Sequence, residues 1–292
     1  MRQFFRIASL NISTVVSDVD GTLVTDDKIL TVSARKAVAE LHARGITFAV
    51  ISSRATRGLR MLVDPLQLTT PICGFNGGVI ARPDLSVITE HLLAPEIAQR
   101  AVDLLDAHNI QVWIFAGQDW LVRDSGGSYI EREERTVGFR PTLVKDFGAY
   151  LDSAVKIVGV NANFEALTQC ERDMRAVLAD QASVVRSQAY YLDITHPMAN
   201  KGIALSALAE LLNIPLAEMA VIGDGDNDVA MFARSGLSIA MGNASPEVRQ
   251  AADLVTESNQ ENGFAAAIKR LILGGECSKT QVETARAGGR TW

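Results

Sequence analysis

The stretch that decides the predicted fold is TVVSDVDGTL, residues 14–23. Its first four residues form a short, largely β-branched run of the kind that becomes a buried strand. Asp18 and Asp20 follow, and their side chains can face the same way because alternate residues of an extended chain share a side. Two carboxylates this close repel each other unless a cation or a proton lies between them. We therefore expect a buried strand followed by a cation-binding loop, with an ordinary acidic turn as the alternative.

A second acidic loop, GDGDND at residues 223–228, follows another predicted strand at residues 219–222. A calcium loop of the EF-hand type is the competing interpretation. It fails because Val229 stands where that loop needs Gly, and Ser235 stands where it needs a bidentate Glu. Sites in parallel sheets gather at the carboxyl ends of the strands. The two loops together therefore predict one site with at least four carboxylates.

A site of this kind suits phosphate chemistry. Carboxylate oxygens are hard ligands that favour Mg²⁺, which also bridges phosphate oxygens. The cation would offset the repulsion between the carboxylates and an incoming phosphate dianion. One carboxylate could then attack phosphorus and give an acyl phosphate that water hydrolyses. A second carboxylate two residues on could protonate the leaving oxygen and later activate that water.

The segments around the two loops alternate between predicted strands and helices, which is typical of a parallel sheet covered by helices. Between them, residues 83–186 break this alternation and favour an α+β insert. We therefore predict an α/β core of residues 1–82 and 187–275, a cap of residues 83–186, and a disordered tail of residues 276–292. The predicted strands are residues 14–17, 46–51, 71–75, 86–91, 111–115, 120–122, 154–160, 219–222, 237–240 and 254–255. The predicted helices are residues 33–43, which Ser33 should cap, and residues 55–63, 95–107, 163–178, 203–212, 229–233, 246–251 and 262–273.

Two shorter segments could bind phosphate. The predicted strand at residues 46–51 runs into Ser52, Ser53 and Arg54, and hydroxyls and backbone N–H groups at a helix start are natural phosphate donors. Simple helix capping is the alternative role for the two serines. Lys201 opens another predicted helix, where its ammonium could hold a phosphate as a point charge. Taken alone, this lysine would be interpreted as a solvent-exposed side chain.

Composition argues against several other functions. The chain has 292 residues and a formal net charge of −6, so no broad basic surface is expected for a nucleic acid. Its three cysteines are far apart and form no Cys/His cluster, which argues against zinc. The N-terminus has no apolar signal segment, and no apolar run reaches the ~18 residues of a membrane span. We therefore expect a cytoplasmic protein that acts on a small molecule and binds neither nucleic acid nor membrane.

These segments, in this order, resemble the four motifs of the haloacid dehalogenase superfamily of phosphatases. The resemblance rests on DVDGTL at residues 18–23, on Ser52, on Lys201, and on the loop of residues 223–228. The insert resembles the α+β cap of the Cof-type branch, subclass IIB. The resemblance covers roughly residues 14–273. It implies the haloacid dehalogenase fold, a Rossmann-like parallel sheet core with an inserted α+β cap.

The resemblance also implies a role for each matching residue. Asp18 would be the nucleophile and a Mg²⁺ ligand, and Asp20 would be the general acid/base that also gives its backbone carbonyl to the metal. Lys201 would neutralise phosphate and orient Asp18, while Asp224 and Asp228 would complete the metal site. The implied phosphate- or substrate-binding residues are Ser52, Ser53, Arg54, Asn76 and Asn227.

The implied function is Mg²⁺-dependent hydrolysis of a small phosphate monoester, a sugar phosphate or related metabolite, through an aspartyl-phosphate intermediate. A phosphosugar mutase of the same cap subclass and a non-catalytic protein that binds a phospho-ligand are the alternatives. Ser53 departs from the family pattern, which has Gly there, and its Cβ could re-aim the phosphate loop. The sequence identifies neither the substrate nor the cap residues that select it, and it does not distinguish a monomer from a homodimer.

Overall fold

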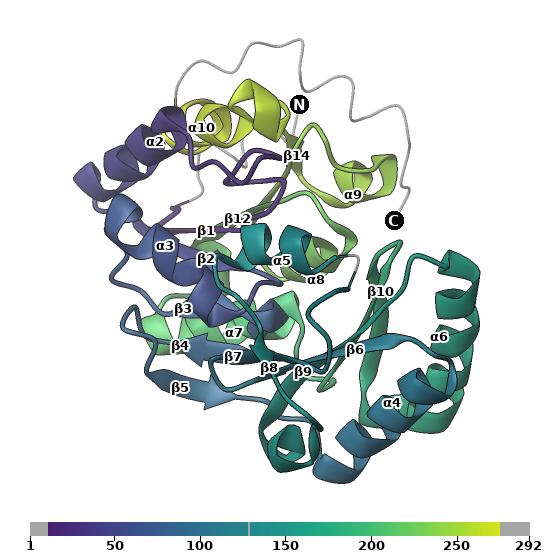
Figure 1. The fold of residues 1–292 in the computed structure, drawn as a ribbon. Coiled ribbons are helices and arrows are strands. Elements are labelled where there is room, and N and C mark those ends of the chain that lie inside the picture. Colours follow the sequence, from purple (N-terminus) through teal and green to yellow (C-terminus); the bar gives the residue numbers. More distant parts are fainter. Residues whose placement is uncertain (1–10, 128, 275–292) are drawn as a thin grey trace. The chain divides into compact units, whose positions relative to one another are not determined.

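The computed structural model describes residues 11–127 and 129–274. The tail that was predicted to be disordered, residues 276–292, lies outside the described residues. Among the helices that are described, none combines the length and the apolar character needed to cross a membrane. The described chain forms two compact units (Figure 1). The first contains residues 11–52, 61–72 and 201–274, and the second contains residues 53–60 and 73–200.

The first unit is built on parallel strands. Five of them lie in the order β14-β13-β12-β1-β2, and every neighbouring pair is parallel. β1 lies between β12 and β2, and all of its residues are buried. The predicted α/β fold class with a parallel sheet is therefore confirmed. These strands are β1 (Thr14–Ser17), β2 (Thr47–Ile51), β12 (Met219–Gly223), β13 (Leu237–Ala240) and β14 (Leu254–Val255).

The helices of this unit follow the predicted pattern with two differences. Ser33 does not cap α2 (Val32–Ala43), because it lies inside the first turn; the hydroxyl of Thr31 accepts a hydrogen bond from Ala34 N at 3.1 Å instead. The predicted helix at residues 262–273 divides into α10 (Gly263–Ala267) and a π turn (Ile268–Ile272). The other helices are α7 (Lys201–Leu212), α8 (Val229–Phe232) and α9 (Pro246–Ala251), with 3₁₀ turns at Leu216–Glu218, Asp226–Asp228 and Asn259–Glu261; α3 (Thr56–Leu66) has residues in both units.

The second unit contains a six-stranded sheet in the order β10-β11-β9-β6-β7-β8. Neighbouring strands are antiparallel except β7 and β8, and the helices do not alternate with the strands. This is the predicted α+β organisation. Its elements are β6 (Gln111–Ala116), β7 (Asp119–Val122), β8 (Thr142–Leu143), β9 (Ala154–Val160), β10 (Ser183–Gln188), β11 (Tyr191–Thr195), α4 (Pro95–Ala107), α5 (Ile130–Val137) and α6 (Phe164–Leu178), with 3₁₀ turns at Gly148–Ser153 and Ala179–Gln181. Before them come β3 (Ile72–Gly74), the turn Phe75–Gly77, β4 (Val79–Ala81) and β5 (Val87–Glu90).

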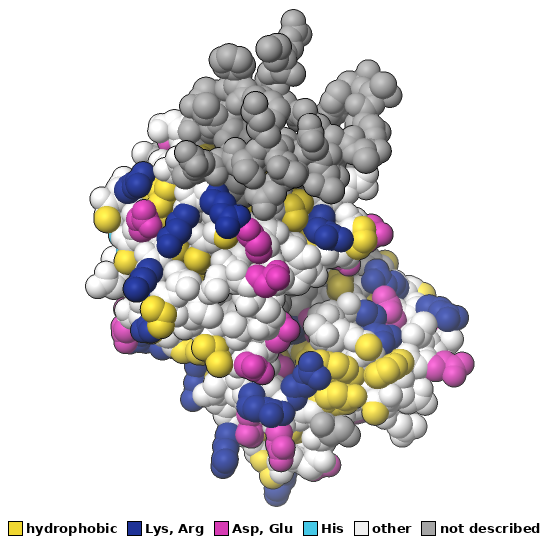
Figure 2. Space-filling model, turned by 90° about the horizontal axis from the view of Figure 1, so that it is seen from above, with side chains coloured by type: hydrophobic (Ala, Val, Ile, Leu, Met, Phe, Trp, Pro, Cys, Tyr) yellow, Lys and Arg dark blue, Asp and Glu magenta, His cyan; other side chains and the backbone are white. Residues whose placement is uncertain are grey.

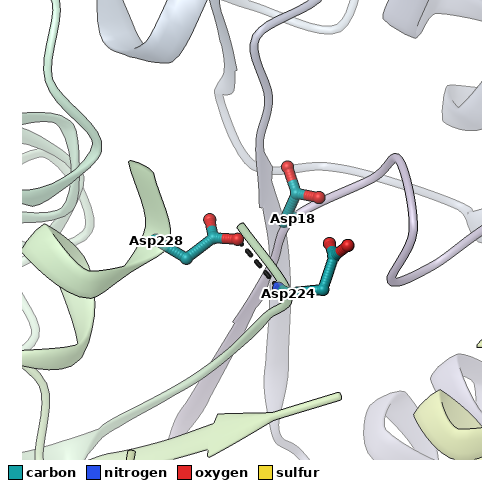
Figure 3. Close-up of side chains that lie close together, drawn as sticks. All are labelled: Asp18, Asp224 and Asp228. Atoms are coloured by element: carbon teal, nitrogen blue, oxygen red, sulfur yellow. Dashed lines mark hydrogen bonds between the residues drawn. The ribbon is translucent and has the colours of Figure 1, made fainter. Parts of the chain in front are cut away.

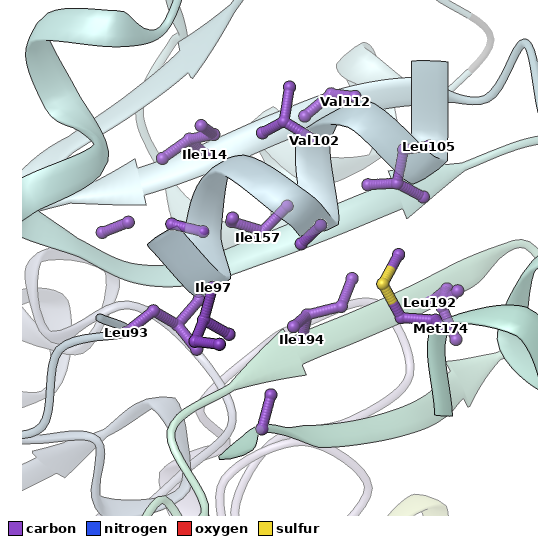
Figure 4. Packing of buried hydrophobic residues seen from close by; sticks show 14 of the residues in the cluster. Leu93, Ile97, Val102, Leu105, Val112, Ile114, Ile157, Met174, Leu192 and Ile194 are labelled. Atoms are coloured by element: carbon purple, nitrogen blue, oxygen red, sulfur yellow. The ribbon is translucent and has the colours of Figure 1, made fainter. Parts of the chain in front are cut away.

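One side of this six-stranded sheet carries the core of the second unit. Leu105 from α4 and Met174 from α6 belong to the same buried cluster as Ile114, Ile157 and Ile194 from three strands (Figure 4). Burial of each such side chain contributes about 1.5–3 kcal/mol. Because strand residues alternate between the two sides of a sheet, their neighbours along the chain point away from α4 and α6.

The second unit contains the whole predicted cap and extends it at both ends. It adds residues 53–60, 73–82 and 187–200 to residues 83–186. The predicted boundaries at residues 82 and 187 stay a prediction.

On the face drawn in Figure 2, the basic and acidic side chains of the described residues are interspersed. An anionic ligand therefore meets no continuous field of one sign on that face, and its binding depends on local groups.

Candidate active site

The site begins where β1 ends. Asp18 is 4% exposed, and its backbone N–H donates to the carbonyl of Ile222 in β12 at 2.9 Å. The chain then turns sharply at Gly21, whose φ of +77° is unfavourable for any residue with a Cβ. A Cβ there would also lie 2.2 Å from Oδ2 of Asp224. Glycine thus allows the loop after β1 to approach the loop after β12. This approach is needed for the two acidic loops to form one site, as predicted.

Three carboxylates meet at this point. Asp18, Asp224 and Asp228 each offer an oxygen, and these oxygens lie within 4.8 Å of one another (Figure 3). Oδ2 of Asp228 accepts hydrogen bonds from the backbone N–H groups of Asp224 at 2.9 Å and Gly225 at 2.8 Å. Because these bonds fix the Asp228 carboxylate, the cluster has a defined geometry. Three hard oxygen donors suit a divalent cation such as Mg²⁺.

Lys201 neutralises part of this charge. Its side chain is 1% exposed, and Nζ lies 2.6 Å from Oδ1 of Asp18 and 2.6 Å from Oδ1 of Asp228. Lys201 is the first residue of α7, as predicted, so the start of this helix places the ammonium between the two acidic loops. Loss of one partner from a buried ion pair leaves an uncompensated charge and is strongly destabilising. The lysine therefore binds the two loops together as well as balancing their charge.

The cluster favours the uptake of a proton or a cation. Burial raises the pKa of Asp18 well above 3.8; Lys201 opposes this rise, and the carboxylates of Asp228 and Asp224 add to it. Burial also raises the pKa of Asp224, to about 6, against a hydrogen bond from Thr22 that lowers it. Burial alone would lower the pKa of Lys201, yet the carboxylates of Asp18 and Asp228 raise it, so the ammonium keeps its proton. The single ammonium of Lys201 does not neutralise all three carboxylates, so the cluster favours a further proton or a cation.

Two other aspartates of the acidic loops do not join this cluster. Oδ1 of Asp20 lies 2.7 Å from Nζ of Lys28, and Asp226 is exposed and is not one of the three aspartates that come together among the described residues. The expected contribution of Asp20 to the metal was through its backbone carbonyl, and that role stays a prediction. The sequence predicted four carboxylates at this site, and three of them form the cluster. The carboxylate of the fourth, Asp20, pairs with Lys28 instead.

The predicted phosphate-binding residues fall in both units. Ser52 is fully buried directly after β2, and Asn227 is exposed in the 3₁₀ turn Asp226–Asp228; both belong to the first unit. Ser53, Arg54 and Asn76 belong to the second unit, where the carbonyl of Arg54 accepts a hydrogen bond from Phe75 N at 2.8 Å. Contact of these residues with phosphate stays a prediction.

Ser53, which stands where the family usually has glycine, does not adopt a left-handed backbone conformation. The described residues with a left-handed backbone include Phe75 and Asn76, but Ser53 is not one of them. A Cβ at this position is therefore compatible with the loop, and the departure from the family pattern carries no backbone strain.

The groups that orient Asp224 were not predicted from the sequence. Thr22 Oγ1 donates to Oδ1 of Asp224 at 2.9 Å, and Asn243 Nδ2 donates to Oδ2 at 3.1 Å and to the carbonyl of Gly21 at 2.9 Å. The backbone N–H of Asn259 donates to Oδ1 of Asn243 at 3.0 Å, which sets the direction of its amide. Asn243 follows β13 closely, so the rule that sites gather at the carboxyl ends of parallel strands could have identified it.

Comparison with known proteins identifies the family. The profile of a family described as haloacid dehalogenase-like hydrolase matches residues 15–268. This range is most of the chain and includes both acidic loops and Lys201. The chain therefore belongs to the haloacid dehalogenase-like hydrolases, and the family predicted from the four motifs is confirmed.

Individual relatives agree with this assignment. The 5-amino-6-(5-phospho-D-ribitylamino)uracil phosphatase YcsE of Bacillus subtilis (strain 168) is 26% identical over 264 residues, which are 90% of this chain and 97% of the relative. A crystal structure of a haloacid dehalogenase-like hydrolase from Bacteroides thetaiotaomicron matches with a TM-score of 0.82 at 26% identity, covering 89% of this chain and all of that one. The subclass IIB sugar phosphatase BT4131 shows the same fold, with a TM-score of 0.76 at 20% identity over 88% of this chain and 98% of its own.

Proposed function

We propose that the protein hydrolyses a small phosphate monoester with the help of Mg²⁺, through a phosphorylated Asp18. A hydrolase of phosphate esters is the function that the family and its phosphatase-named relatives support. The observation that carries the mechanism is the cluster of Asp18, Asp224 and Asp228 around Lys201. We propose a sugar phosphate or a related metabolite as the substrate, since the relative YcsE is named as the phosphatase of a phosphoribityl compound. A cytoplasmic location is part of the same proposal.

The residues present fit a magnesium ion. Asp18, Asp224 and Asp228 supply only carboxylate oxygens, within 4.8 Å of one another, and the carboxylates of Asp224 and Asp228 are held by hydrogen bonds from the protein. When bound, the ion supplies positive charge that offsets the repulsion between this cluster and a phosphate dianion. The hydrogen bonds matter because fixed ligands need no rearrangement when the ion binds.

The reaction itself is carried by two aspartates. An oxygen of Asp18 forms a bond to phosphorus while the bond from phosphorus to the ester oxygen breaks, and Asp20 gives that oxygen a proton. Asp20 then takes a proton from water, the water oxygen attacks phosphorus, and phosphate leaves with the Asp18 carboxylate restored. Lys201 donates to Oδ1 of Asp18 at 2.6 Å, and this hydrogen bond would hold the nucleophile in one orientation.

This arrangement favours hydrolysis over the two alternatives. A protein that only binds its ligand has no need of the buried lysine and carboxylates that activate a nucleophile, yet all of them are present here. A phosphosugar mutase would return the phosphoryl group to a sugar, and the relative described above is named as a phosphatase. Release of free phosphate, rather than formation of an isomer, is therefore the expected outcome.

The test is a phosphatase assay over a panel of metabolite phosphates, with Mg²⁺ and with EDTA. We expect free phosphate to appear from at least one ester only with Mg²⁺, and we expect Asp18→Asn to abolish turnover while its circular dichroism stays that of the wild type. Asp226→Asn is the matched control, because it makes the same change at an exposed carboxylate outside the cluster. Normal turnover by Asp18→Asn would refute the proposed nucleophile.

A further inference from the structure

An ion pair lies beside the cluster, in the loop that follows β1. Nζ of Lys28 is 2.7 Å from Oδ1 of Asp20, and the two side chains are 33% and 24% exposed. An ion pair that solvent reaches to this extent contributes little to the stability of a fold. The pair is therefore better explained by the group that Lys28 contacts, which is the proposed general acid/base.

The turn of residues 25–29, which carries Lys28, has a defined shape. The backbone N–H of Lys28 donates to the carbonyl of Thr25 at 2.9 Å, and that of Thr25 donates to the carbonyl of Ile29 at 3.1 Å. Lys28 has a left-handed backbone, with a φ of 63°. This conformation is uncommon in residues with a Cβ and needs support from the surrounding structure. The turn therefore fixes the direction in which the Lys28 side chain leaves the backbone.

Hydrogen bonds through Asn259 connect the same turn to the carboxylate cluster. Asn259 is 6% exposed, and its Nδ2 donates to Oδ1 of Asp26 in the turn at 3.0 Å. Its backbone N–H donates to Oδ1 of Asn243 at 3.0 Å, and Asn243 donates to Oδ2 of Asp224 at 3.1 Å. All of these residues belong to the first unit. The place of the turn relative to the proposed metal ligands is therefore set within that unit.

The carboxylate of Asp20 is close enough to the cluster to affect it. Burial is the largest cause of the raised pKa of Asp224, and the charge of Asp20 is among the smaller causes that add to it. The backbone of Asp20 pairs with that of Val24 in an isolated bridge, so its position is fixed. Its carboxylate can still rotate about the side-chain bonds. Lys28 is a partner that holds one of these orientations.

An ammonium suits this task because it only donates. Lys28 has three N–H donors and no acceptor, so it binds a carboxyl oxygen without competing for the proton that Asp20 must deliver. While Oδ1 accepts from Lys28, Oδ2 carries the proton that Asp20 gives to the ester oxygen and later takes from water. Proton transfer needs its two heavy atoms about 2.6–3.2 Å apart, so a carboxyl group that rotates freely would transfer the proton less often.

We propose that Lys28 is a positioning residue for the reaction, whose ammonium holds Oδ1 of Asp20 so that Oδ2 transfers the proton. Lys28 acts through Asp20. This inference rests on the proposed phosphatase function and adds to it the residue that orients the general acid/base. An ordinary surface ion pair is the alternative, and it predicts no effect on turnover.

The kinetic test compares two esters that differ in their need for a proton. The leaving groups of phenyl phosphate and 4-nitrophenyl phosphate have similar shapes, but phenolate is far more basic than 4-nitrophenolate and needs a proton as it leaves. Lys28→Met should lower kcat/KM for phenyl phosphate about 10- to 100-fold, part of the roughly 100- to 10,000-fold that general acid–base catalysis contributes. For 4-nitrophenyl phosphate, kcat/KM should stay within about threefold, because this parameter covers the reaction up to departure of the leaving group, and 4-nitrophenolate departs without a proton.

Two further variants separate positioning from a general effect of charge. Lys28→Arg keeps a cationic donor and should recover most of the loss. Lys36→Met is the matched control, since it makes the same change at an exposed lysine of the same unit, and it should alter neither ester. The loss in Lys28→Met should appear in kcat, with KM within about threefold of the wild type. Because the ion pair is partly exposed, this variant should keep the circular dichroism of the wild type.

The outcomes separate this inference from the proposed function. If the wild type hydrolyses neither the two aryl esters nor any ester of the metabolite panel, both proposals fail. If the wild type is active, an equal loss on the two aryl esters, a rise in KM alone, or full activity of Lys28→Met overturns only the role of Lys28. If the wild type hydrolyses a metabolite ester but not the aryl esters, Lys28→Met and Lys28→Arg are compared on that ester, and absence of the loss or of its recovery overturns the same role.

Discussion

Magnesium should stabilise the folded protein by about 1–2 kcal/mol more at pH 7.5 than at pH 5.0. Burial raises the pKa of Asp224 from 3.8 to about 6, so at pH 5.0 about one carboxyl in eleven is ionised there, against nearly all at pH 7.5. A metal ligand must be deprotonated, so the apparent affinity for Mg²⁺ falls about tenfold at the lower pH. Each tenfold corresponds to about 1.4 kcal/mol of stabilisation at a saturating metal concentration.

The sign follows from the linkage between protons and folding. The pKa of Asp224 is higher in the folded chain than in the unfolded one, so without metal the folded state binds this proton more tightly. Its contribution to stability is present below pH 3.8 and is lost as the pH rises through about 6. The raised pKa of Asp18 acts in the same direction. Magnesium supplies the positive charge that the proton no longer provides above this range.

The assay is urea unfolding at each pH, with EDTA or with one fixed Mg²⁺ concentration, about 100 times the dissociation constant at pH 7.5, at constant ionic strength. Far-UV circular dichroism is the suitable probe, because Trp113 and Trp120 both lie in the second unit and report on that unit alone. Taking the difference with and without metal at one pH cancels the titration of all distant groups. Asp224→Asn should lose most of the increment, whereas Asp226→Asn should keep it. An increment that is equal at the two pH values would refute this account of the cluster.

Three further changes probe the same cluster. Lys201→Met should lower kcat about 100- to 1000-fold, because it leaves two buried carboxylates without their ammonium; steady-state kinetics measure this, and an unchanged kcat would show that the ammonium has no catalytic part. Gly21→Ala should destabilise the protein in urea by about 1–3 kcal/mol more than Gly45→Ala. Both sites have a left-handed backbone, but only at Gly21 would the new Cβ clash with a neighbour, Oδ2 of Asp224 at 2.2 Å. Equal losses of stability would show that this close approach has no effect. Asn243→Ala should weaken Mn²⁺ binding about 10-fold, since it removes a donor to Asp224; electron paramagnetic resonance of free Mn²⁺ gives the affinity, and wild-type affinity would contradict that role.

The candidate site could largely be predicted because its signals are local. The strand predicted at residues 14–17 is β1 (Thr14–Ser17), and Lys201 opens α7 as its position implied. Each acidic loop directly follows an apolar run, so its place at the end of a strand is visible in a few residues. The fold class follows for the same reason, since the alternation of strands and helices is written along the chain.

The missed elements lack such local signals. β11 (Tyr191–Thr195) has a buried aspartate at its centre, and the lysine that pairs with it, Lys156, comes from another strand. α5 (Ile130–Val137) buries only Ile130 and Val137, so its charged sequence shows no apolar stripe. Asn243 differs, because its place just after β13 is a local signal; what a short window does not show is its hydrogen bond to Asp224 in another loop. Long-range compensation of a polar group leaves no pattern in a short window.

From the charges of the cluster we expect a cation to bind before the phosphate ester. Three carboxylates and one ammonium leave an excess of negative charge beside Asp18, and a phosphate dianion would be repelled from it. A divalent cation removes that excess, but it leaves little positive charge to hold the phosphoryl group. Further donors are therefore needed to hold the phosphoryl group, which is the role predicted from the sequence for Ser52, Arg54 and Asn227. The full burial of Lys201 between two aspartates suits its proposed role, because its ammonium would stay with the proposed nucleophile, whereas an exposed lysine would be free to follow the departing phosphate.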